Sequence, residues 1–265
     1  MPIMPWDAVL LPPVAGRSQK PRRTGWTMVI DKGLGPSATD DLIALAAPYI
    51  DLVKLTFGTS FFYTRQQLVK KIALLKKNDI GVMPGGTLGE VAQIQGKWPI
   101  YVERLVELGF DCVEISDGTI SLGDADRDRA IEIALDAGLR VVTEIGKKNP
   151  ADELDPARQI GRALADLAAG AAMVIVEGRE SGRDAGIYGK SGEIRADRLE
   201  IIAGRLPPAR TIWEAPQKSQ QEELILRFGP DANLGNIPPA DALALEALRI
   251  GLRGDTLRAV LQRSG

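Results

Sequence analysis

From Thr24 onward, short apolar runs rich in β-branched residues alternate with amphipathic stretches of helical length. Consecutive runs end 23 to 37 residues apart, and this spacing fits one strand–loop–helix–loop unit each. Eight parallel units in about 250 residues predict a (β/α)8 TIM barrel. A doubly wound open sheet is the alternative, although no Gly-x-Gly-x-x-Gly fingerprint follows the first run. The predicted strands are Thr27–Asp31, Leu52–Phe57, Gly81–Pro84, Cys112–Ser116, Arg140–Ile145, Met173–Glu177, Thr211–Glu214 and Asn233–Ile237.

Helix-start signals fall between these strands in the expected places. Asp155-Pro156 matches an N-cap followed by proline at the first helical position. Three pairs have the spacing of a capping box, namely Thr64 with Gln67, Thr87 with Glu90, and Ser219 with Glu222. Residues 25–265 are therefore expected to form one barrel domain. Residues 1–24 hold five prolines and are expected to form an N-terminal extension, either loosely ordered or packed as a cap under the barrel.

Charged residues recur where these strands end, and catalytic residues of such barrels lie at that end. The set comprises Asp31, Lys54, Glu114, Glu144, Glu177 and Glu214, with Lys32, Lys147, Lys148 and Arg179 in the loops that follow. A charge in an apolar strand is costly to bury unless it is paired or bound to a ligand. Any single one is equally well explained by a structural ion pair. Their repetition on six strands of eight favours a functional site.

Composition narrows the chemistry of that site. The 265 residues include no histidine and a single cysteine, Cys112. A Ser-His-Asp triad, a histidine base and an intrachain disulfide are therefore excluded, and a zinc, copper or non-haem iron site is disfavoured. Any metal is expected to be a hard, oxygen-ligated ion such as Mg²⁺. Proton transfer is left to Lys, Glu, Asp, Tyr or water.

The overall charge balance bears on partners and location. The chain has 33 basic and 35 acidic residues, a net charge of −2, which gives no global attraction to nucleic acid. No apolar run approaches the roughly 20 residues that span a bilayer, and the N-terminal residue order does not match a secretory signal. We expect a cytoplasmic protein that acts on small molecules, without nucleic-acid or membrane partners, and a homo-oligomer as a common state of barrels of this size.

Three of the acidic residues end successive strands and should be neighbours around the barrel rim. They are Glu144, Glu177 and Glu214. Clustered carboxylates repel one another, and a divalent cation resolves that conflict. We predict that they form a Mg²⁺ site, with Asp31 as a fourth candidate ligand. The alternative is that some of these carboxylates pair with Lys54 or Lys147 instead.

Cationic side chains suit an anionic substrate and a proton donor. Lys32, Lys148 and Arg179 are candidates for neutralising phosphate or carboxylate groups. Because the chain lacks histidine, a lysine with cationic neighbours is the natural donor of a proton to a carbanion.

Loop residues near the strand ends are further candidates for substrate contacts. Gly85 and Gly86 open a helix whose amides could hold an anion, and a tight turn explains them equally well. Lys218 and Ser219 open the helix after the seventh strand, where phosphate sites of this fold often lie, and Ser219 is at least as well explained as an N-cap. Gly235-Asn236 lies at the end of the eighth strand and could complete that site.

Long runs of sequence resemble the phosphosulfolactate synthase family. The similarity covers nearly all of Trp26 to Thr256 in order. It is carried by Asp31-Lys32-Gly33-Leu34, Val53-Lys54, Gly58-Thr59-Ser60, Pro84-Gly85-Gly86-Thr87-Leu88, Val113-Glu114-Ile115-Ser116-Asp117-Gly118, Thr143-Glu144, Gly146-Lys147-Lys148, Glu177-Gly178-Arg179-Glu180-Ser181-Gly182, Glu214-Ala215-Pro216-Gln217-Lys218-Ser219-Gln220-Gln221 and Gly251-Leu252-Arg253-Gly254-Asp255-Thr256.

The resemblance implies a (β/α)8 barrel that adds sulfite to phosphoenolpyruvate with Mg²⁺, giving (2R)-phospho-3-sulfolactate. This reaction opens coenzyme M biosynthesis in methanogenic archaea and leads to sulfolactate in some bacteria. Lys147 is our first choice as the lysine that protonates C2, with Lys148 or Lys54 as alternatives. Glu114 is a further catalytic candidate, and Arg179, Lys32 and Lys54 would neutralise phosphate and sulfonate groups.

Two other functions stay open at this point. One is a different Mg²⁺-dependent lyase or transferase acting on a small phosphorylated carboxylate. The other is a non-catalytic protein similar to the heat-stress-associated plant branch of the same family. The charged residues at the strand ends argue against the second, because a scaffold does not need them.

Overall fold

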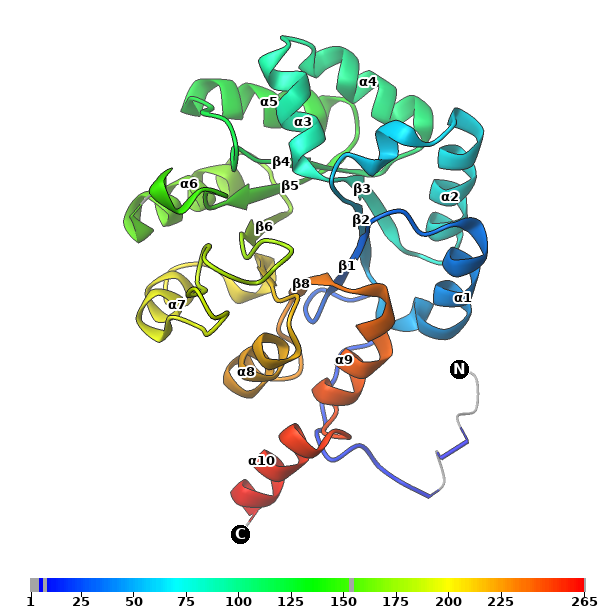
Figure 1. Ribbon diagram of the computed structural model, residues 1–265, viewed down its shortest axis with the longest axis vertical. Helices are drawn as coiled ribbons and strands as arrows, with labels where there is room; N and C mark the ends of the chain where they lie inside the picture. Colours follow the sequence, from blue (N-terminus) through cyan, green and yellow to red (C-terminus); the bar gives the residue numbers. More distant parts are fainter. Residues whose placement is uncertain (1–4, 7–8, 153–154, 265) are drawn as a thin grey trace.

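The computed structural model describes residues 5–6, 9–152 and 155–264. Eight parallel strands form a ring with the helices outside it (Figure 1). The hydrogen-bonded order is β3-β2-β1-β8-β7-β6-β5-β4, and β3 and β4, at the two ends of this order, lie against each other. The predicted (β/α)8 barrel is confirmed, and the open sheet is excluded because the first and last strands of the order meet.

The strands occupy the regions that the sequence pattern predicts. They are β1 (Thr27–Asp31), β2 (Leu52–Leu55), β3 (Gly81–Pro84), β4 (Cys112–Ile115), β5 (Arg140–Ile145), β6 (Met173–Val176), β7 (Thr211–Glu214) and β8 (Leu234–Ile237). Four of them are one or two residues shorter than predicted. In β2 the cause is visible, because Phe57 has a left-handed backbone with φ of 56° and cannot continue a strand.

The helices and short 3₁₀ turns fill the connections. The helices are α1 (Pro36–Ala46), α2 (Arg65–Lys77), α3 (Gly86–Ile94), α4 (Trp98–Leu108), α5 (Asp124–Asp136), α6 (Pro156–Ala168), α7 (Ala196–Ala203), α8 (Lys218–Phe228), α9 (Ala242–Arg249) and α10 (Gly254–Ser264). The 3₁₀ turns are η1 (Ala47–Tyr49), η2 (Thr59–Phe62), η3 (Pro150–Asp152), η4 (Pro208–Arg210) and η5 (Pro239–Asp241). Among the described helices, none combines the length and apolarity needed to cross a membrane.

Two of the four predicted helix starts are confirmed. Thr64 and Gln67 form a capping box at α2, and Asp155 caps α6 through two backbone N–H groups. At α8 the prediction is wrong by two residues, because Gln217 is the N-cap. At α3 the N-cap is Gly85, which has no side chain to supply the cap.

The barrel interior is built from two layers of different character. The side chains of Leu52, Cys112, Val142 and Ile212 belong to an apolar cluster that is fully buried. Two positions further along each of these strands stand Lys54, Glu114, Glu144 and Glu214. Side chains alternate between the two faces of a strand, so residues two apart share a face. The charged residues therefore form a layer directly above the apolar one, at the ends of the strands.

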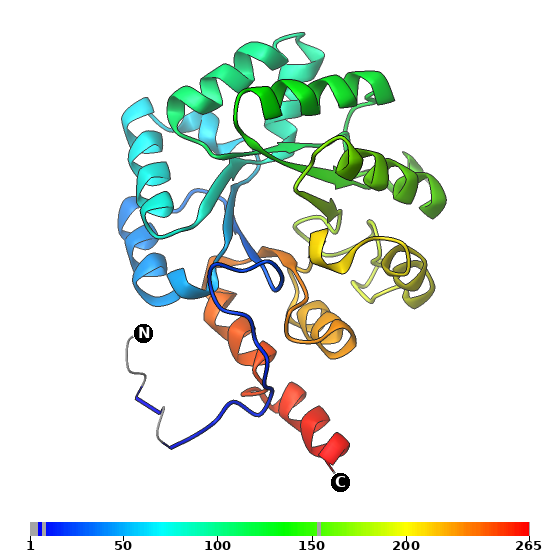
Figure 2. The same cartoon turned by 180° about the vertical axis from the view of Figure 1, so that it is seen from behind.

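The last part of the predicted N-terminal extension packs against the end of the barrel where the strands begin (Figure 2). Arg17 pairs with Asp231, just before β8, and with Glu246 on α9. Arg22 donates two 3.0 Å hydrogen bonds to Asp51, which precedes β2. Residues 1–4 and 7–8 of that extension, and residues 153–154 and 265 of the predicted barrel domain, lie outside the described residues.

The Arg22–Asp51 pair predicts that this segment contributes to stability. Both side chains are buried, and Arg22→Ala would leave the Asp51 carboxylate without its cation, a loss of about 3–5 kcal/mol in unfolding free energy. The neighbouring Arg23 is exposed, so Arg23→Ala is the matched control and should change stability by less than about 0.5 kcal/mol. Urea unfolding of both variants measures the difference, and equal stabilities would show that the segment is not part of the folded unit.

Candidate active site

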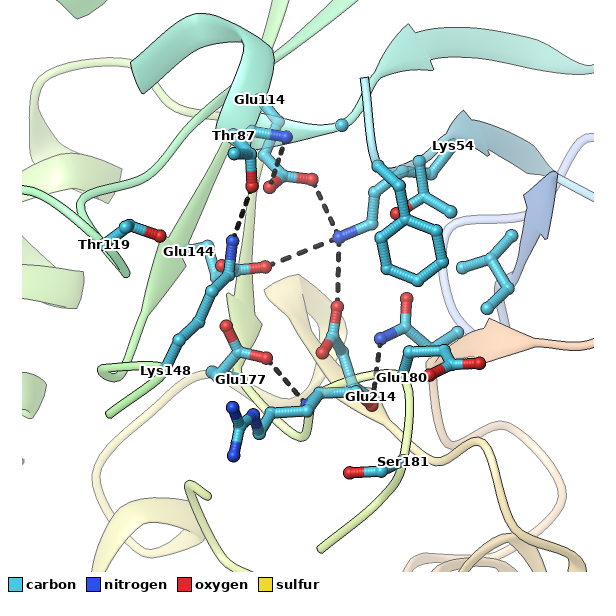
Figure 3. A pocket seen from close by; sticks show the side chains of 17 residues that line it. Lys54, Thr87, Glu114, Thr119, Glu144, Lys148, Glu177, Glu180, Ser181 and Glu214 are labelled. Atoms are coloured by element: carbon cyan, nitrogen blue, oxygen red, sulfur yellow. Dashed lines mark hydrogen bonds and ion pairs between the residues drawn. The ribbon is translucent and has the colours of Figure 1, made fainter. Parts of the chain in front are cut away.

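The charged layer is organised around one lysine. The Lys54 ammonium lies 2.9 Å from Glu114 Oε2, 3.0 Å from Glu214 Oε1 and 3.4 Å from Glu144 Oε2 (Figure 3). All four side chains are at most 6% exposed. A buried ammonium is stable only with compensating charge, and here three carboxylates from three strands supply it.

Backbone N–H groups fix the orientation of the carboxylates. Gly86 donates to Glu114 Oε1 at 3.0 Å, and Gly178 donates to Glu214 Oε2 at 3.0 Å. Glycine is required at position 86, because a Cβ there would lie 2.2 Å from the Glu114 carboxylate. The N–H of Arg179 donates to Glu177 Oε1 at 2.7 Å.

Glu144, Glu177 and Glu214 can present carboxylate oxygens within 4.8 Å of one another. All three residues are buried, and Glu144 Oε1 and Glu177 Oε2 accept no hydrogen bond. An orphaned buried carboxylate oxygen is costly, and a cation between the three groups would satisfy it. An all-oxygen donor set fits a hard divalent ion. The predicted metal residues thus form a cluster that could bind such an ion.

The electrostatics of the cluster depend on burial and on Lys54. Burial raises the pKa of Glu177 well above its usual value, and the nearby Glu144 and Glu214 raise it further. Burial also raises the pKa of Glu114, to about 7, against the opposing attraction of Lys54. For Glu144, the attraction of Lys54 and Lys148 outweighs the effect of burial and lowers the pKa. Burial lowers the pKa of Lys54, but the attraction of Glu114, Glu214 and Glu144 outweighs this effect and raises the pKa well above normal.

A cavity of about 580 Å³ opens above the charged layer. Five glutamates and three cations line it, and the cations are Lys54, Lys148 and Arg179. Lys148 comes from the loop after β5 and donates to Thr87 Oγ1 at 2.7 Å. The pKa of Lys148 is raised, because Glu144 and Glu177 outweigh the effect of burial. The cavity therefore combines the carboxylates and Lys54 of the charged layer with two cationic groups from loops, Lys148 and Arg179.

Three residues that line the cavity have an unusual backbone. Phe57, Arg179 and Asn236 are non-glycine residues with φ of 56°, 61° and 54°. Such left-handed conformations cost energy and cluster at functional sites. They lie at the ends of β2, β6 and β8, around the same opening, and Asn236 Nδ2 donates to the Arg179 carbonyl at 3.4 Å.

The structure brings most of the predicted site residues together. Lys54, Gly85, Gly86, Glu114, Glu144, Lys148, Glu177, Arg179, Glu214 and Asn236 all line this cavity. Asp31, Lys32, Lys147, Lys218 and Ser219 are not among its lining residues.

Asp31 does not join the carboxylate cluster. It stands in phase with Val29, which packs in the outer core between strands and helices, so its side chain faces outward. There it forms an ion pair with Lys71 on α2 and accepts the N–H groups of Gly33 and Leu34 at 2.7 Å. This expectation is corrected: Asp31 is satisfied by protein groups away from the cluster.

Other predicted contacts also have protein partners outside the cavity. Lys147 donates to Asp117 and to the Ile120 carbonyl, on the loop after β4. Lys218 pairs with Glu222 and Asp255, and Ser219 is an ordinary first-turn residue of α8. Lys32 forms an ion pair with Glu180, which does line the cavity, so Lys32 stands at its edge.

Several residues that line or support the cavity are not predicted from the sequence. Thr87, which the sequence pattern predicts as a helix cap, is instead the partner of Lys148. Its supposed capping partner Glu90 is buried and accepts hydrogen bonds from Ser116 Oγ and the Thr119 N–H. Glu180 and Ser181 also line the cavity. The signal available for the cavity residues is their position soon after a strand: Thr87 lies in the first turn of α3 behind β3, and Glu180 and Ser181 lie in the loop behind β6.

The central role of Lys54 predicts a pH-dependent loss of stability in Lys54→Met. Without the ammonium, three buried carboxylates lose their counter-charge, and breaking such a pair costs about 3–5 kcal/mol. The cost should be largest at pH 8 and smaller at pH 5.5, where Glu114 and Glu177, whose pKa values are raised, are protonated and neutral. Urea unfolding at both pH values measures it.

A double variant provides the control for this prediction. Lys54→Met combined with Glu114→Gln removes one charge of each sign, so it should recover part of the lost stability at pH 8. A loss that is equal at both pH values and unchanged in the double variant would contradict the electrostatic explanation.

The comparisons with known proteins agree on one family. The model of the (2R)-phospho-3-sulfolactate synthase (ComA) family matches residues 15–255. A phosphosulfolactate synthase of Methanothermobacter thermautotrophicus is 46% identical over 253 residues, which cover 95% of this chain and 97% of that protein. One of Methanocaldococcus jannaschii is 43% identical over 238 residues, covering 89% and 95%.

A comparison of folds gives a compatible result. A crystal structure of 3-hexulose-6-phosphate synthase superposes with a TM-score of 0.54 at 19% identity, covering 84% of this chain and 99% of that one. At that identity the likeness speaks for the barrel fold alone. The sequence relationships carry the assignment, and the chain belongs to the (2R)-phospho-3-sulfolactate synthase family as an enzyme of that type.

Proposed function

We propose that this enzyme catalyses the Mg²⁺-dependent addition of sulfite to phosphoenolpyruvate, giving (2R)-phospho-3-sulfolactate. The observation that carries the proposal is one cavity that combines a carboxylate cluster with separate cationic groups. Glu144, Glu177 and Glu214 form the cluster, and Lys148 and Arg179 line the same cavity. An acceptor with a carboxylate and a phosphate needs both kinds of group.

The three clustered glutamates would hold the metal. When bound there, Mg²⁺ acts as a Lewis acid that lowers the energy of negative charge on the substrate carboxylate. Lys54 forms ion pairs with Glu144 and Glu214, so it holds these two carboxylates in position. Arg179, with its backbone fixed at Glu177 and Asn236, would neutralise a phosphate or sulfonate group.

The chemical step needs a nucleophile, an electron sink and a proton. The sulfite sulfur supplies an electron pair to C3, the C3–S bond forms, and the C2–C3 π electrons move towards C2 and the carboxylate. A proton then adds to C2 on one face. Lys148 is the best candidate for the donor of this proton, because it lines the cavity and its ammonium donates to the Thr87 hydroxyl. Lys54 is enclosed by three carboxylates, and Lys147 is bonded to another loop.

Metal binding is expected to stabilise the protein in a pH-dependent way. A cation must displace the proton that the raised pKa of Glu177 retains, so affinity should fall as pH is lowered from 8 to 6. At a hundredfold excess over Kd, bound metal adds about 2.7 kcal/mol to the unfolding free energy. Thermal unfolding with and without MgCl₂ at both pH values measures the shift, and Glu177→Gln should abolish it. An unchanged melting temperature at pH 8 in MgCl₂ would argue against the site.

The reaction itself is tested by product formation. Phosphoenolpyruvate, sulfite and MgCl₂ are incubated with the protein, and phosphosulfolactate is followed by mass spectrometry. Lys148→Met should lower kcat by roughly 10²–10⁴-fold, because a positioned proton donor contributes that much. Lys77→Met, at an exposed position on α2, is the control and should have wild-type kcat. No product and no consumption of phosphoenolpyruvate by the wild type would contradict the proposal.

A further inference from the structure

We propose that Lys147 is a positioning residue that clamps the loop after β4 and thereby holds Lys148 in place for proton transfer. The inference rests on the proposed function for the role of Lys148. It gives the two adjacent lysines different tasks, one structural and one chemical.

Lys147 uses its ammonium group entirely within the loop. It donates to the Asp117 carbonyl, to Asp117 Oδ2 at 2.8 Å and to the Ile120 carbonyl at 2.9 Å. An ammonium has three N–H donors, and these three acceptors occupy them. The side chain is 13% exposed, and it does not line the cavity. Its geometry therefore suits a clamp.

The clamp is linked to β5, the strand that carries Glu144 of the carboxylate cluster. Arg127, fully buried on α5, donates to Asp117 Oδ1 at 3.2 Å and to the Glu144 carbonyl at 2.9 Å. Two further bonds, at 2.8 Å and 2.7 Å, join Arg127 to Asp166 on α6. Lys147 thus binds Asp117, which Arg127 also ties to the Glu144 carbonyl near the end of β5.

A second buried side chain, Glu90, also holds the loop. Glu90 on α3 accepts hydrogen bonds from Ser116 Oγ and from the Thr119 N–H, both at 3.2 Å. Glu90 and Lys147 together fix residues 116, 117, 119 and 120. The residue left between these contacts is Gly118.

Gly118 is where the clamped loop meets Lys148. Its carbonyl accepts the Lys148 backbone N–H at 3.0 Å. A Cβ added at Gly118 would lie 3.3 Å from both Cγ and Cε of Lys148, so the lysine stem runs directly along this glycine. At its far end the ammonium donates to Thr87 on α3. Lys148 is therefore enclosed between the clamped loop and α3, and loosening the loop frees its stem.

The main test compares Lys147→Met with Lys77→Met. Lys147→Met is expected to lower kcat roughly tenfold to a hundredfold, with a smaller change in KM, because displacing a reacting group by about 1 Å costs that much. It should also increase hydrogen–deuterium exchange in peptides covering residues 116–123. Lys147→Arg keeps a cation with several N–H donors and should restore most of both properties. Lys77→Met should change neither.

A second variant moves Lys148 without touching the clamp. Gly118→Ala keeps every hydrogen bond of the loop and brings a methyl group against the Lys148 stem. It should lower kcat while exchange in residues 116–123 stays at the wild-type level. This variant keeps the proposal testable if Lys147→Met does not fold.

Either of two kinetic results would overturn the proposal. One is a kcat within threefold of wild type in Lys147→Met, or in Gly118→Ala where Lys147→Met does not fold. The other is recovery of Lys147→Ala activity by added small amines, which would make Lys147 the donor itself. Labelling of Lys148 with acetic anhydride, read by mass spectrometry, separates this test from the proposed function. Faster labelling in Lys147→Met supports the clamp even if the wild type makes no phosphosulfolactate, and unchanged labelling contradicts it.

Discussion

The attraction between Lys54 and three glutamates is the interaction on which the rest of the site depends. The four buried carboxylates, those three and Glu177, would repel one another, and desolvation alone would keep them protonated. One ammonium from β2, reaching carboxylates on β4, β5 and β7, lets a buried acidic layer exist at neutral pH. On each of these strands the charged residue follows the apolar one by two positions. The reaction can occur only at the charged layer, because that layer lines the cavity and the apolar layer does not.

The sequence pattern was sufficient to predict the fold and the charged layer. Regular spacing of apolar runs gave all eight strands, and the positions of Lys54, Glu114, Glu144 and Glu214 near the strand ends placed them at one rim. The error at Asp31 shows the limit of this argument. Both faces of β1 are buried and each carries apolar side chains, so the pattern does not show which face points inward. The ion-pair partner of Asp31 is Lys71, which lies 40 residues away on α2, and the local sequence does not predict that contact.

Loops were less predictable, for a physical reason. Gly146 has φ of 116°, and the alternation of faces that holds along β5 is lost beyond it. Which of Lys147 and Lys148 enters the cavity is therefore decided by contacts with another loop and with α3. The start of α8 also differs from the prediction, because the identity of the capping residue is unusual. A glutamine served as the N-cap there, whereas serine is the residue that statistics favour.

The two ends of the barrel have separate tasks. Arg17 and Arg22 join the chain preceding β1 to the end where the strands begin, while the cavity opens at the end where they finish. The separation has a practical side. An affinity tag or a covalent linker attached ahead of Arg17 would anchor the molecule by the end of the barrel opposite the cavity. An enzyme immobilised in this way would present its open mouth to the flowing substrate.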